Sequence, residues 1–237
     1  MADGLSLLAW GDAGWGDEMA RGALVTLAVA ICSFAISLII GTGTAAAKLS
    51  GFLPARLAAD AYIVLMRGIP DLLIIYLLFF GGSMALMSVA SVFGHTGYLE
   101  LPIFATGAIA IGIASGAYTG EVIRGAFEAV PKGQIEAARA CGMSGFLLFR
   151  RIQAPLALRY ALPGLGNAWQ VTLKETALIS VIGLVEIMRQ AAIASGSTQQ
   201  PFTFYFVAAI AYLGLTLLSN RGFAAAEAYA TRGVRRA

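Results

Sequence analysis

The sequence is poor in charge. Only 12% of its 237 residues are Asp, Glu, Lys or Arg, about half the share that soluble domains usually carry. Hydrophobic residues make up 59%, and the mean hydropathy is +0.79. This composition excludes a soluble globular domain and predicts an all-α integral membrane protein that forms one domain over residues 1–237.

Residue types that bind metals or act as nucleophiles are scarce as well. The single histidine, His95, stands alone. The two cysteines, Cys32 and Cys141, lie in unrelated segments with neither disulfide nor metal spacing. We therefore expect no metal site and no catalytic residues, which excludes a membrane-bound enzyme.

A phosphate-binding loop is also absent. Such a loop needs a lysine directly after a glycine, and none of Lys48, Lys132 and Lys174 follows one. We expect no cofactor in this chain, so any ATP and magnesium would be bound by a separate subunit. The net charge of +3 resides in segments between apolar runs. It therefore indicates membrane topology and not a nucleic-acid partner.

Apolar runs predict five membrane spans. The first is uncharged and long enough to cross about 30 Å of hydrocarbon. The start of the second is ambiguous because Arg67, Pro70 and Asp71 interrupt it. We place Arg67 near the cytoplasmic end and expect residues 84–93 to lie along the outer interface. The predicted spans are about 22–47, 60–81, 102–124, 160–184 and 202–221.

The basic residues orient these spans. Lys48 and Arg56 follow the first span, whereas the residues before it are mostly acidic. Cytoplasmic loops are rich in Lys and Arg, so we expect the amino terminus outside and the carboxyl terminus in the cytoplasm. The basic residues of the loop between spans three and four and of the tail are Arg124, Lys132, Arg139, Arg150, Arg151, Arg159, Arg221, Arg232, Arg235 and Arg236.

The segment 131–155 is a charged, glycine-punctuated stretch between two apolar runs. Glu136, Ala137 and Ala138 should lie in a short helix, which Gly142 ends because glycine adopts the left-handed conformation without cost. Small alanine side chains let a helix approach a partner closely while favouring helix formation. We therefore expect a cytoplasmic coupling helix between spans three and four.

The spacing of this segment resembles the loop by which permease subunits of bacterial ABC importers dock onto their ATPase. It contains E-A-A, three residues, G, nine residues, I, and a proline three residues further on, although Ala154 stands where the family usually has Leu. The resemblance implies an ATPase-coupling set of Gly133, Glu136, Ala137, Ala138, Gly142, Ile152 and Pro155.

Charged residues at membrane depth form the second signal. Lys174 and Glu175 interrupt the fourth apolar run, and such residues normally face a protein interior or a transport path. As neighbours on a helix they point about 100° apart. Each can therefore belong to a substrate site or to a structural ion pair. Glu121 leaves the same two interpretations open, with Arg124 one turn away as its possible partner.

Four stretches together resemble the polar amino acid permease family of ABC importers, of the histidine, lysine, arginine, ornithine and opine type. They are RGIPDLL from Arg67, YTGEVIRGA from Tyr118, GQIEAARACGM from Gly133 and LKETAL from Leu173. The resemblance implies a second permease subunit, identical or homologous, an ATPase dimer and an external substrate-binding protein. It also implies location in the bacterial inner membrane.

The same resemblance assigns candidate substrate contacts. The LKET segment implies that Lys174 meets a substrate carboxylate, whereas Glu175 and Thr176 meet amino groups or a cationic side chain. Ser115 belongs to the set, although Ala114 before it replaces the Asn or His that the family often has. Glu121 is the further acidic candidate.

The sequence leaves one competing function. A secondary transporter or ion channel could use Lys174 and Glu175 for ions or protons within the membrane. Such a protein has no use for an ATPase-docking segment, and secondary transporters more often contain internal repeats, of which this sequence has no sign.

Overall fold

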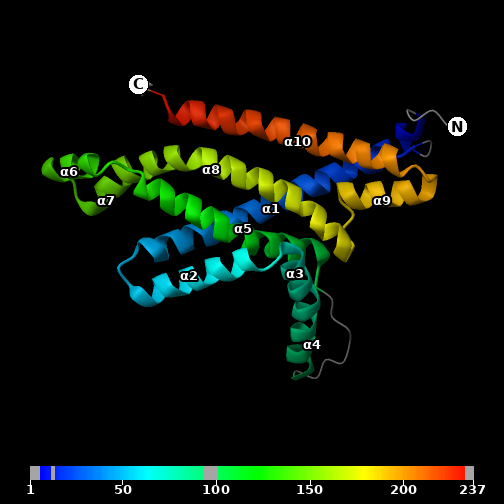
Figure 1. The fold of residues 1–237 in the computed structure, drawn as a ribbon, viewed down its shortest axis with the longest axis horizontal. Helices are drawn as coiled ribbons and strands as arrows, with labels where there is room; N and C mark the ends of the chain where they lie inside the picture. The colour runs from blue at the N-terminus through cyan, green and yellow to red at the C-terminus, as the bar shows by residue number, and fades with distance from the viewer. Residues whose placement is uncertain (1–5, 12–13, 93–100, 233–237) are drawn as a thin grey trace.

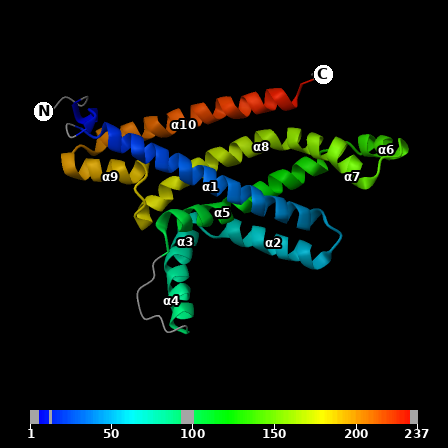
Figure 2. The same ribbon diagram turned by 180° about the vertical axis from the view of Figure 1, so that it is seen from behind.

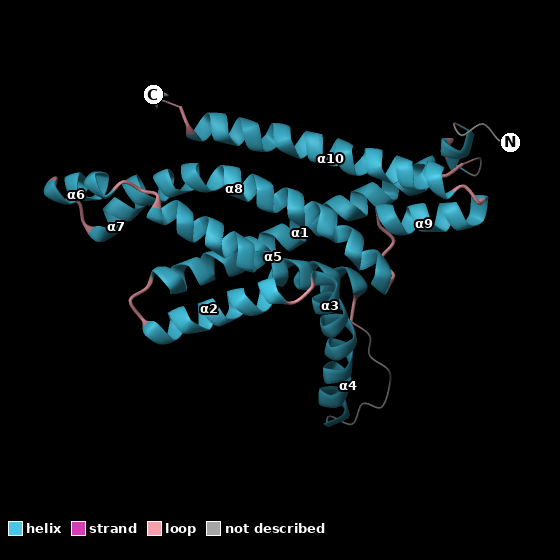
Figure 3. Cartoon of the chain, in the orientation of Figure 1, coloured by secondary structure: helices cyan, strands magenta, loops and turns pink. Residues whose placement is uncertain are grey.

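The computed structural model describes residues 6–11, 14–92 and 101–232, and all regular structure within them is helical (Figure 3). His95, Arg235 and Arg236 lie outside the described residues. The helices are η1 (Ser6–Leu8), α1 (Gly16–Leu49), α2 (Leu53–Gly68), α3 (Asp71–Tyr76), η3 (Leu77–Gly81), α4 (Gly82–Val92), α5 (Ile103–Glu128), α6 (Lys132–Ala140), α7 (Gly145–Leu148), η4 (Phe149–Gln153), α8 (Ala154–Glu175), η5 (Thr176–Ile182), α9 (Ile187–Thr198) and α10 (Pro201–Ala230).

The long helices α1, α5, α8 and α10 run alongside one another, together with the shorter α2 (Figures 1 and 2). The helix formed by α3, η3 and α4 stands across them. The amino-terminal region and α9 lie at one end of this bundle. The turn between α1 and α2, the short helices α6 and α7 and the carboxyl-terminal end of α10 lie at the other.

Four helical stretches are long and apolar enough to cross a membrane: Gly16–Leu49, Asp71–Val92, Ile103–Glu128 and Pro201–Ala230. A fifth candidate is the stretch Gly145–Ile182 together with Ile187–Thr198, which bends by 50° at the break between them. The chain is therefore an all-helical membrane protein with four or five candidate spans.

The second predicted span, 60–81, is not one helix. Helix α2 ends at Gly68, and Ile69 is extended, with φ −103° and ψ 133°, because a residue before proline avoids the helical region. A new helix begins at Asp71 and continues to Val92. Residues 84–92, expected along the interface, are thus the end of this helix.

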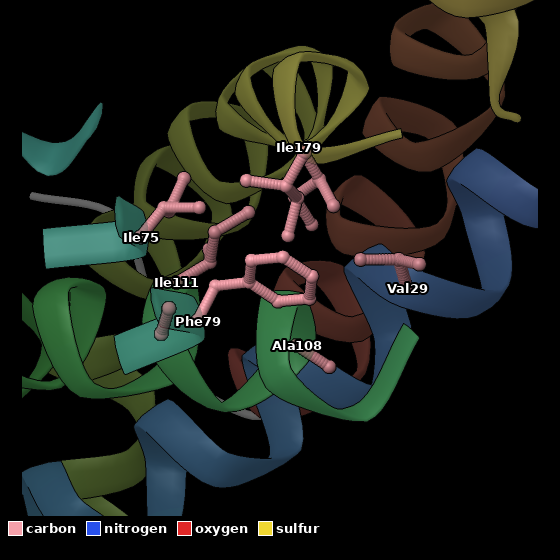
Figure 4. Packing of buried hydrophobic residues seen from close by; sticks show 8 residues of the cluster. Val29, Ile75, Phe79, Ala108, Ile111 and Ile179 are labelled. Atoms are coloured by element: carbon pink, nitrogen blue, oxygen red, sulfur yellow. The ribbon is translucent and has the colours of Figure 1, made fainter. Parts of the chain in front are cut away.

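A cluster of buried side chains joins the crosswise helix to the bundle (Figure 4). Phe79 of η3 and Ile75 of α3 pack against residues from α1, α5 and η5. The other buried members are Val29, Ala108, Ala110, Ile111, Ile179 and Ile182. This packing holds the start of α3 beside α5 and η5, next to the polar cavity described below.

Glycines let α1 and α5 approach each other. A Cβ atom on Gly41 would lie 2.9 Å from the backbone nitrogen of Gly120 and 2.9 Å from Cγ2 of Thr119. Small residues at such crossings allow the close packing that drives helix association in membranes. On the same helix, a Cβ atom on Gly43 would meet no other side chain or helix of the described chain within 4 Å.

We expect Gly41→Ala and Gly43→Ala to change stability in opposite directions. Gly41→Ala should lower the melting temperature of the purified protein, because overpacking costs about 1–3 kcal/mol. Gly43→Ala should leave it unchanged or raise it, because alanine favours a helix by up to about 1 kcal/mol over glycine. Equal melting temperatures for the two variants would contradict this account of the crossing.

Candidate functional site

A polar cavity of about 400 Å³ lies where α2 ends and α3 begins, against α5 and α8. It contains side chains of both charges. Its polar lining comprises Arg67, Asp71, Ser115, Tyr118, Asn167 and Glu175, and its apolar lining comprises Met66, Ile69, Pro70, Ala114, Ala168 and Val171.

Glu175, the last residue of α8, accepts a hydrogen bond in this cavity. The Ser115 hydroxyl donates to Oε2 of Glu175 over 3.0 Å. The Thr172 hydroxyl in turn donates to Oγ of Ser115 over 3.2 Å. The carboxyl of Asp71 faces the same cavity and lies close enough to Glu175 to interact with it. Two acids thus share one wall.

The local sequence explains how Asp71 reaches this wall. Pro70 ends the extended segment and precedes the first helical residue, Asp71. A carboxylate in the first turn interacts favourably with the helix dipole. Two neighbouring carboxylates repel each other unless a cation or a proton lies between them, so the cavity favours a positively charged ligand group.

The cavity lies near the middle of the bundle. Gly112 of α5 packs against Ile36 of α1, and Gly116 packs against Ile40. Ser115 therefore lies level with the central part of the uncharged run 22–47. Ionisable residues at this depth normally mark a substrate or ion path.

Lys174 and Thr176 do not line this cavity. Lys174 is exposed and has no ion-pair partner within 4 Å in the described part of the chain. Thr176 is buried, donates to the Leu173 carbonyl over 2.7 Å and lies 3.4 Å from the Tyr212 hydroxyl. Of the predicted substrate set, the structure brings together Ser115 and Glu175.

Glu121 belongs to a separate cluster of ion pairs. Nζ of Lys48 lies 2.7 Å from both Asp60 and Glu121, which joins α1, α2 and α5. Arg124 contacts Glu121 over 2.8 Å, as its position one turn away predicted, and Glu128 over 2.6 Å. This cluster accounts for Glu121 without a ligand.

Sequence patterns alone miss part of the cavity. They place Arg67 near the cytoplasmic end of a span; in the structure Arg67 is the second-to-last residue of the 16-residue helix α2, about 21 Å from its first residue. They show Asp71 only as an interruption. The feature of the sequence that could have placed both Arg67 and Asp71 in the cavity is Pro70, because it separates the end of α2 from the start of α3 between these two charged residues. Tyr118 and Asn167, whose amide donates to the Tyr118 hydroxyl over 3.0 Å, carry no such signal.

The segment 131–155 forms a second distinctive surface at one end of the molecule (Figure 1). Glu136, Ala137 and Ala138 lie in α6, as predicted, and Ala138 is buried. Gly142 has φ +75°. Its N–H donates to Arg139, and the N–H of Met143 donates to Ala138, which together form a Schellman stop.

The remaining members of the predicted coupling set lie before and after this stop in the chain. Gly133 is exposed in the first turn of α6. Ile152 lies in the π-helical turn η4, and Pro155 follows at the start of α8.

A helical membrane protein with a charged cavity at mid-depth and a polar helical segment at one end has the architecture of a transport permease. The chain belongs to the family of binding-protein-dependent transport system inner membrane components, whose sequence pattern matches residues 37–228. It is a multi-pass inner-membrane permease of an ABC importer, and ATP is hydrolysed by a separate subunit. A permease of this family carries no cofactor itself. Family membership excludes the competing prediction of a secondary transporter or channel.

Curated relatives match nearly the whole chain. The nopaline transport system permease protein NocQ of Agrobacterium fabrum is 57% identical, with 98% of each chain covered. The octopine transport system permease protein OccQ of Rhizobium meliloti is 53% identical over the same shares. The histidine/lysine/arginine/ornithine transport system permease protein HisQ of Escherichia coli is 43% identical, covering 94% of this chain and 98% of its own.

Solved structures share the fold. A crystal structure of an amino acid ABC transporter with histidines superposes with a TM-score of 0.77 and 34% identity, covering 91% of this chain and 95% of that one. The MetNI methionine ABC transporter in an inward-facing conformation gives a TM-score of 0.71 at 17% identity, covering 92% and 98%. The second likeness concerns the fold alone.

Proposed function

We propose that this permease carries opines or basic amino acids, and that the cavity at Glu175 and Asp71 receives the cationic part of the substrate. The main observation behind this proposal is that the carboxyls of Asp71 and Glu175 lie on one wall of the cavity at mid-membrane depth. The relatives named for nopaline, octopine and the basic amino acids handle substrates with such cationic groups.

The chemistry of an amino acid explains the mixed charge of the cavity. Its ammonium and carboxylate groups lose hydration when buried, and each then needs an opposite charge or aligned dipoles. Glu175, Asp71 and Ser115 suit the positive groups. Two cations, Arg67 in the cavity and Lys174 on the neighbouring face of α8, are available for the carboxylate. We assign the carboxylate to Lys174, with Arg67 as the second cation, and leave Thr176 and Glu121 outside the site.

The exposed face of α8 supports a second permease subunit. Asn167, Val171 and Lys174 follow one another along this face and are all exposed. Leu173 packs against Ala30, a residue inside the uncharged run of α1, so Lys174 also lies at hydrocarbon depth. A lone cation facing lipid there costs several kcal/mol. We therefore propose that a homologous or identical permease covers this face and completes the substrate path.

The distribution of charge supports the orientation in the membrane. The basic segment 131–155, the turn after Lys48 and the carboxyl-terminal end of α10 gather at one end of the bundle (Figure 1). Positive charge is retained on the cytoplasmic side. We propose that this end is cytoplasmic and that the amino terminus and α9 lie outside, where the external binding protein would deliver substrate.

We further propose that α6 and the residues up to Pro155 dock onto the ATPase dimer. In α6, Glu136 and Ala137 are exposed while Ala138 anchors the helix to the rest of the chain. A short helix that protrudes from the bundle and is stopped by Gly142 can transmit a rigid-body movement through α7 and η4 to α8, which starts at Ala154.

The first prediction here concerns the substrate site. Glu175→Gln keeps the shape of the side chain and removes its charge, so uptake of a basic substrate should fall at least about tenfold, which corresponds to about 1.4 kcal/mol. The measurement is initial uptake into proteoliposomes with the cognate binding protein and ATPase at subsaturating substrate. Glu121→Gln is the matched control and should leave the apparent KM unchanged.

Lys174→Met provides the complementary arm of this experiment. Uptake of neutral and basic amino acids should fall by the same factor, because every amino acid carries the carboxylate. Unchanged uptake in Glu175→Gln at equal membrane levels would remove that residue from the site and shift the substrate site to the second permease subunit.

The next prediction concerns topology. In a Cys32→Ser variant, the exposed Cys141 is the remaining thiol and should react with a membrane-impermeant maleimide only after cells are permeabilised. A cysteine introduced by Ser197→Cys, in a background lacking both natural cysteines, should react in intact cells. The reverse labelling pattern would overturn the proposed orientation.

The third prediction concerns coupling. Gly142→Val should leave the protein in the membrane but abolish substrate-stimulated ATP hydrolysis, because a β-branched residue resists the left-handed conformation. A Cβ at Gly142 meets nothing within 4 Å in the described chain, and the same is true of Gly145, whose φ is ordinary. Gly145→Val therefore controls for bulk, and Gly142→Asn should retain coupling because asparagine tolerates this conformation. Normal coupled transport by Gly142→Val would refute the proposal.

A further inference from the structure

Glu186 is a fully buried carboxylate outside the proposed substrate cavity. It precedes α9, and its Oε1 accepts a hydrogen bond from the backbone N–H of Arg189 over 2.9 Å. Its Oε2 accepts from the hydroxyl of Tyr212 over 2.9 Å and from that of Thr26 over 3.3 Å. The donors belong to α9, α10 and α1, so one side chain connects three helices.

This carboxylate has no basic partner within 4 Å among residues 6–11, 14–92 and 101–232. Burial of a carboxylate is unfavourable unless hydrogen bonds replace its hydration, and bonds to an ionised acceptor are the stronger kind. A helix amino terminus could be capped at far lower cost by serine or threonine. The longer side chain of Glu186 instead reaches donors on α1 and α10 as well as capping α9.

The chain is broken where Glu186 lies. Gly183 ends η5 with φ +102°, and the stretch ending at Ile182 and helix α9 bend by 50°. Helix α1 approaches this break closely, because a Cβ on Gly22 would lie 3.1 Å from the backbone carbon of Glu186. Thr26 also accepts a hydrogen bond from the N–H of Ile187 over 3.2 Å. The break between η5 and α9 is thus packed against α1 and hydrogen-bonded to it.

The same contacts lead to the cavity. The Tyr212 hydroxyl that donates to Glu186 lies 3.4 Å from Oγ1 of Thr176. Thr176 is the first residue of η5 and directly follows Glu175. Tyr212 therefore contacts the first residue of η5, and Glu186 fixes the chain shortly after its last residue, Ile182. A short 3-10 segment is held only weakly by its own hydrogen bonds.

We propose that Glu186 is a positioning residue for substrate uptake: with Tyr212 it holds η5 against α1 and α10, and thereby keeps the Glu175 carboxylate beside Ser115. This inference rests on the proposed role of Glu175 in binding substrate. It assigns to Glu186 and Tyr212 no contact with the substrate itself.

The test compares kinetic constants in proteoliposomes that contain the full transporter with its ATPase and binding protein. Nopaline, octopine and L-arginine are tried as probes, and the one taken up fastest is used. Tyr212→Phe keeps the ring and loses only the hydroxyl, and Glu186→Gln keeps the shape and an acceptor oxygen. Each should raise the apparent KM about fivefold, with Vmax per assembled transporter within about twofold.

The decisive measurement repeats both substitutions in a Glu175→Gln background. A residue that acts through Glu175 should then raise KM no further, because coupled residues are non-additive. Gln190→Leu is the control: Gln190 is buried on α9 and donates to the Glu18 carbonyl over 3.2 Å. It ties α9 to α1 but not to Tyr212, so its KM should match that of the unsubstituted protein.

The outcomes separate this inference from the proposed function. A KM that rises equally in both backgrounds, that rises as much in Gln190→Leu, or that does not rise at all in Tyr212→Phe and Glu186→Gln overturns the positioning role alone. A KM unaffected by Glu175→Gln by itself overturns the proposed substrate site, and the positioning role with it.

Discussion

A charged side chain within the hydrocarbon of a membrane must meet protein or water, and this constraint organises the polar residues of the permease. Three solutions occur in the described chain. Lys48 and Glu121 form ion pairs at one end of the bundle. Glu186 is buried with hydrogen-bond donors from three helices. Glu175 lines an open cavity together with a second acid. The first two solutions satisfy the charge internally, whereas the third leaves it available to a ligand. This contrast is the reason for proposing Glu175, and neither Glu121 nor Glu186, as a substrate contact.

The cavity occurs where regular helix stops. Pro70 separates α2 from α3, and α8 changes to the 3-10 segment η5 directly after Glu175. A continuous helix satisfies its own backbone groups and presents side chains at a fixed spacing. A break redirects side chains and tolerates irregular backbone where it is buried in protein or lines a cavity. Discontinuous helices at a binding site near the bilayer midplane recur among transporters for this reason. The apolar cluster around Phe79 holds the two breaks next to each other.

Close helix packing gives this arrangement its rigidity. Gly41 and Gly120 bring the backbones of α1 and α5 together, so the wall that carries Ser115 is fixed to the longest helix of the chain. That helix also contacts the break at Glu186 through Thr26. A movement imposed on α8 from the segment 131–155 would therefore meet resistance at both ends of η5. Segment 131–155 leads into α8, whose last residue is Glu175, so the proposed docking segment and one part of the proposed substrate wall belong to one continuous stretch of chain.

Local composition explains what the sequence showed by itself: the membrane character, the long apolar helices, the short helix around Glu136 and its stop at Gly142. Each depends on residues close together in the chain, whose hydropathy and backbone preferences act in any context. The sequence also predicted Ser115 and Glu175 as substrate contacts, and the structure places them in one cavity. It did not show that Asp71 lines the same cavity or that Thr176 lies beside Tyr212. From the sequence, Pro70 indicates only that one span is interrupted. The direction of the helix after it depends on how Ile75 and Phe79 pack against α1, α5 and η5. Lys48 and Glu121 are 73 residues apart, and only helix packing brings them together. Tertiary structure alone determined which charges are paired within the protein and which line an open cavity.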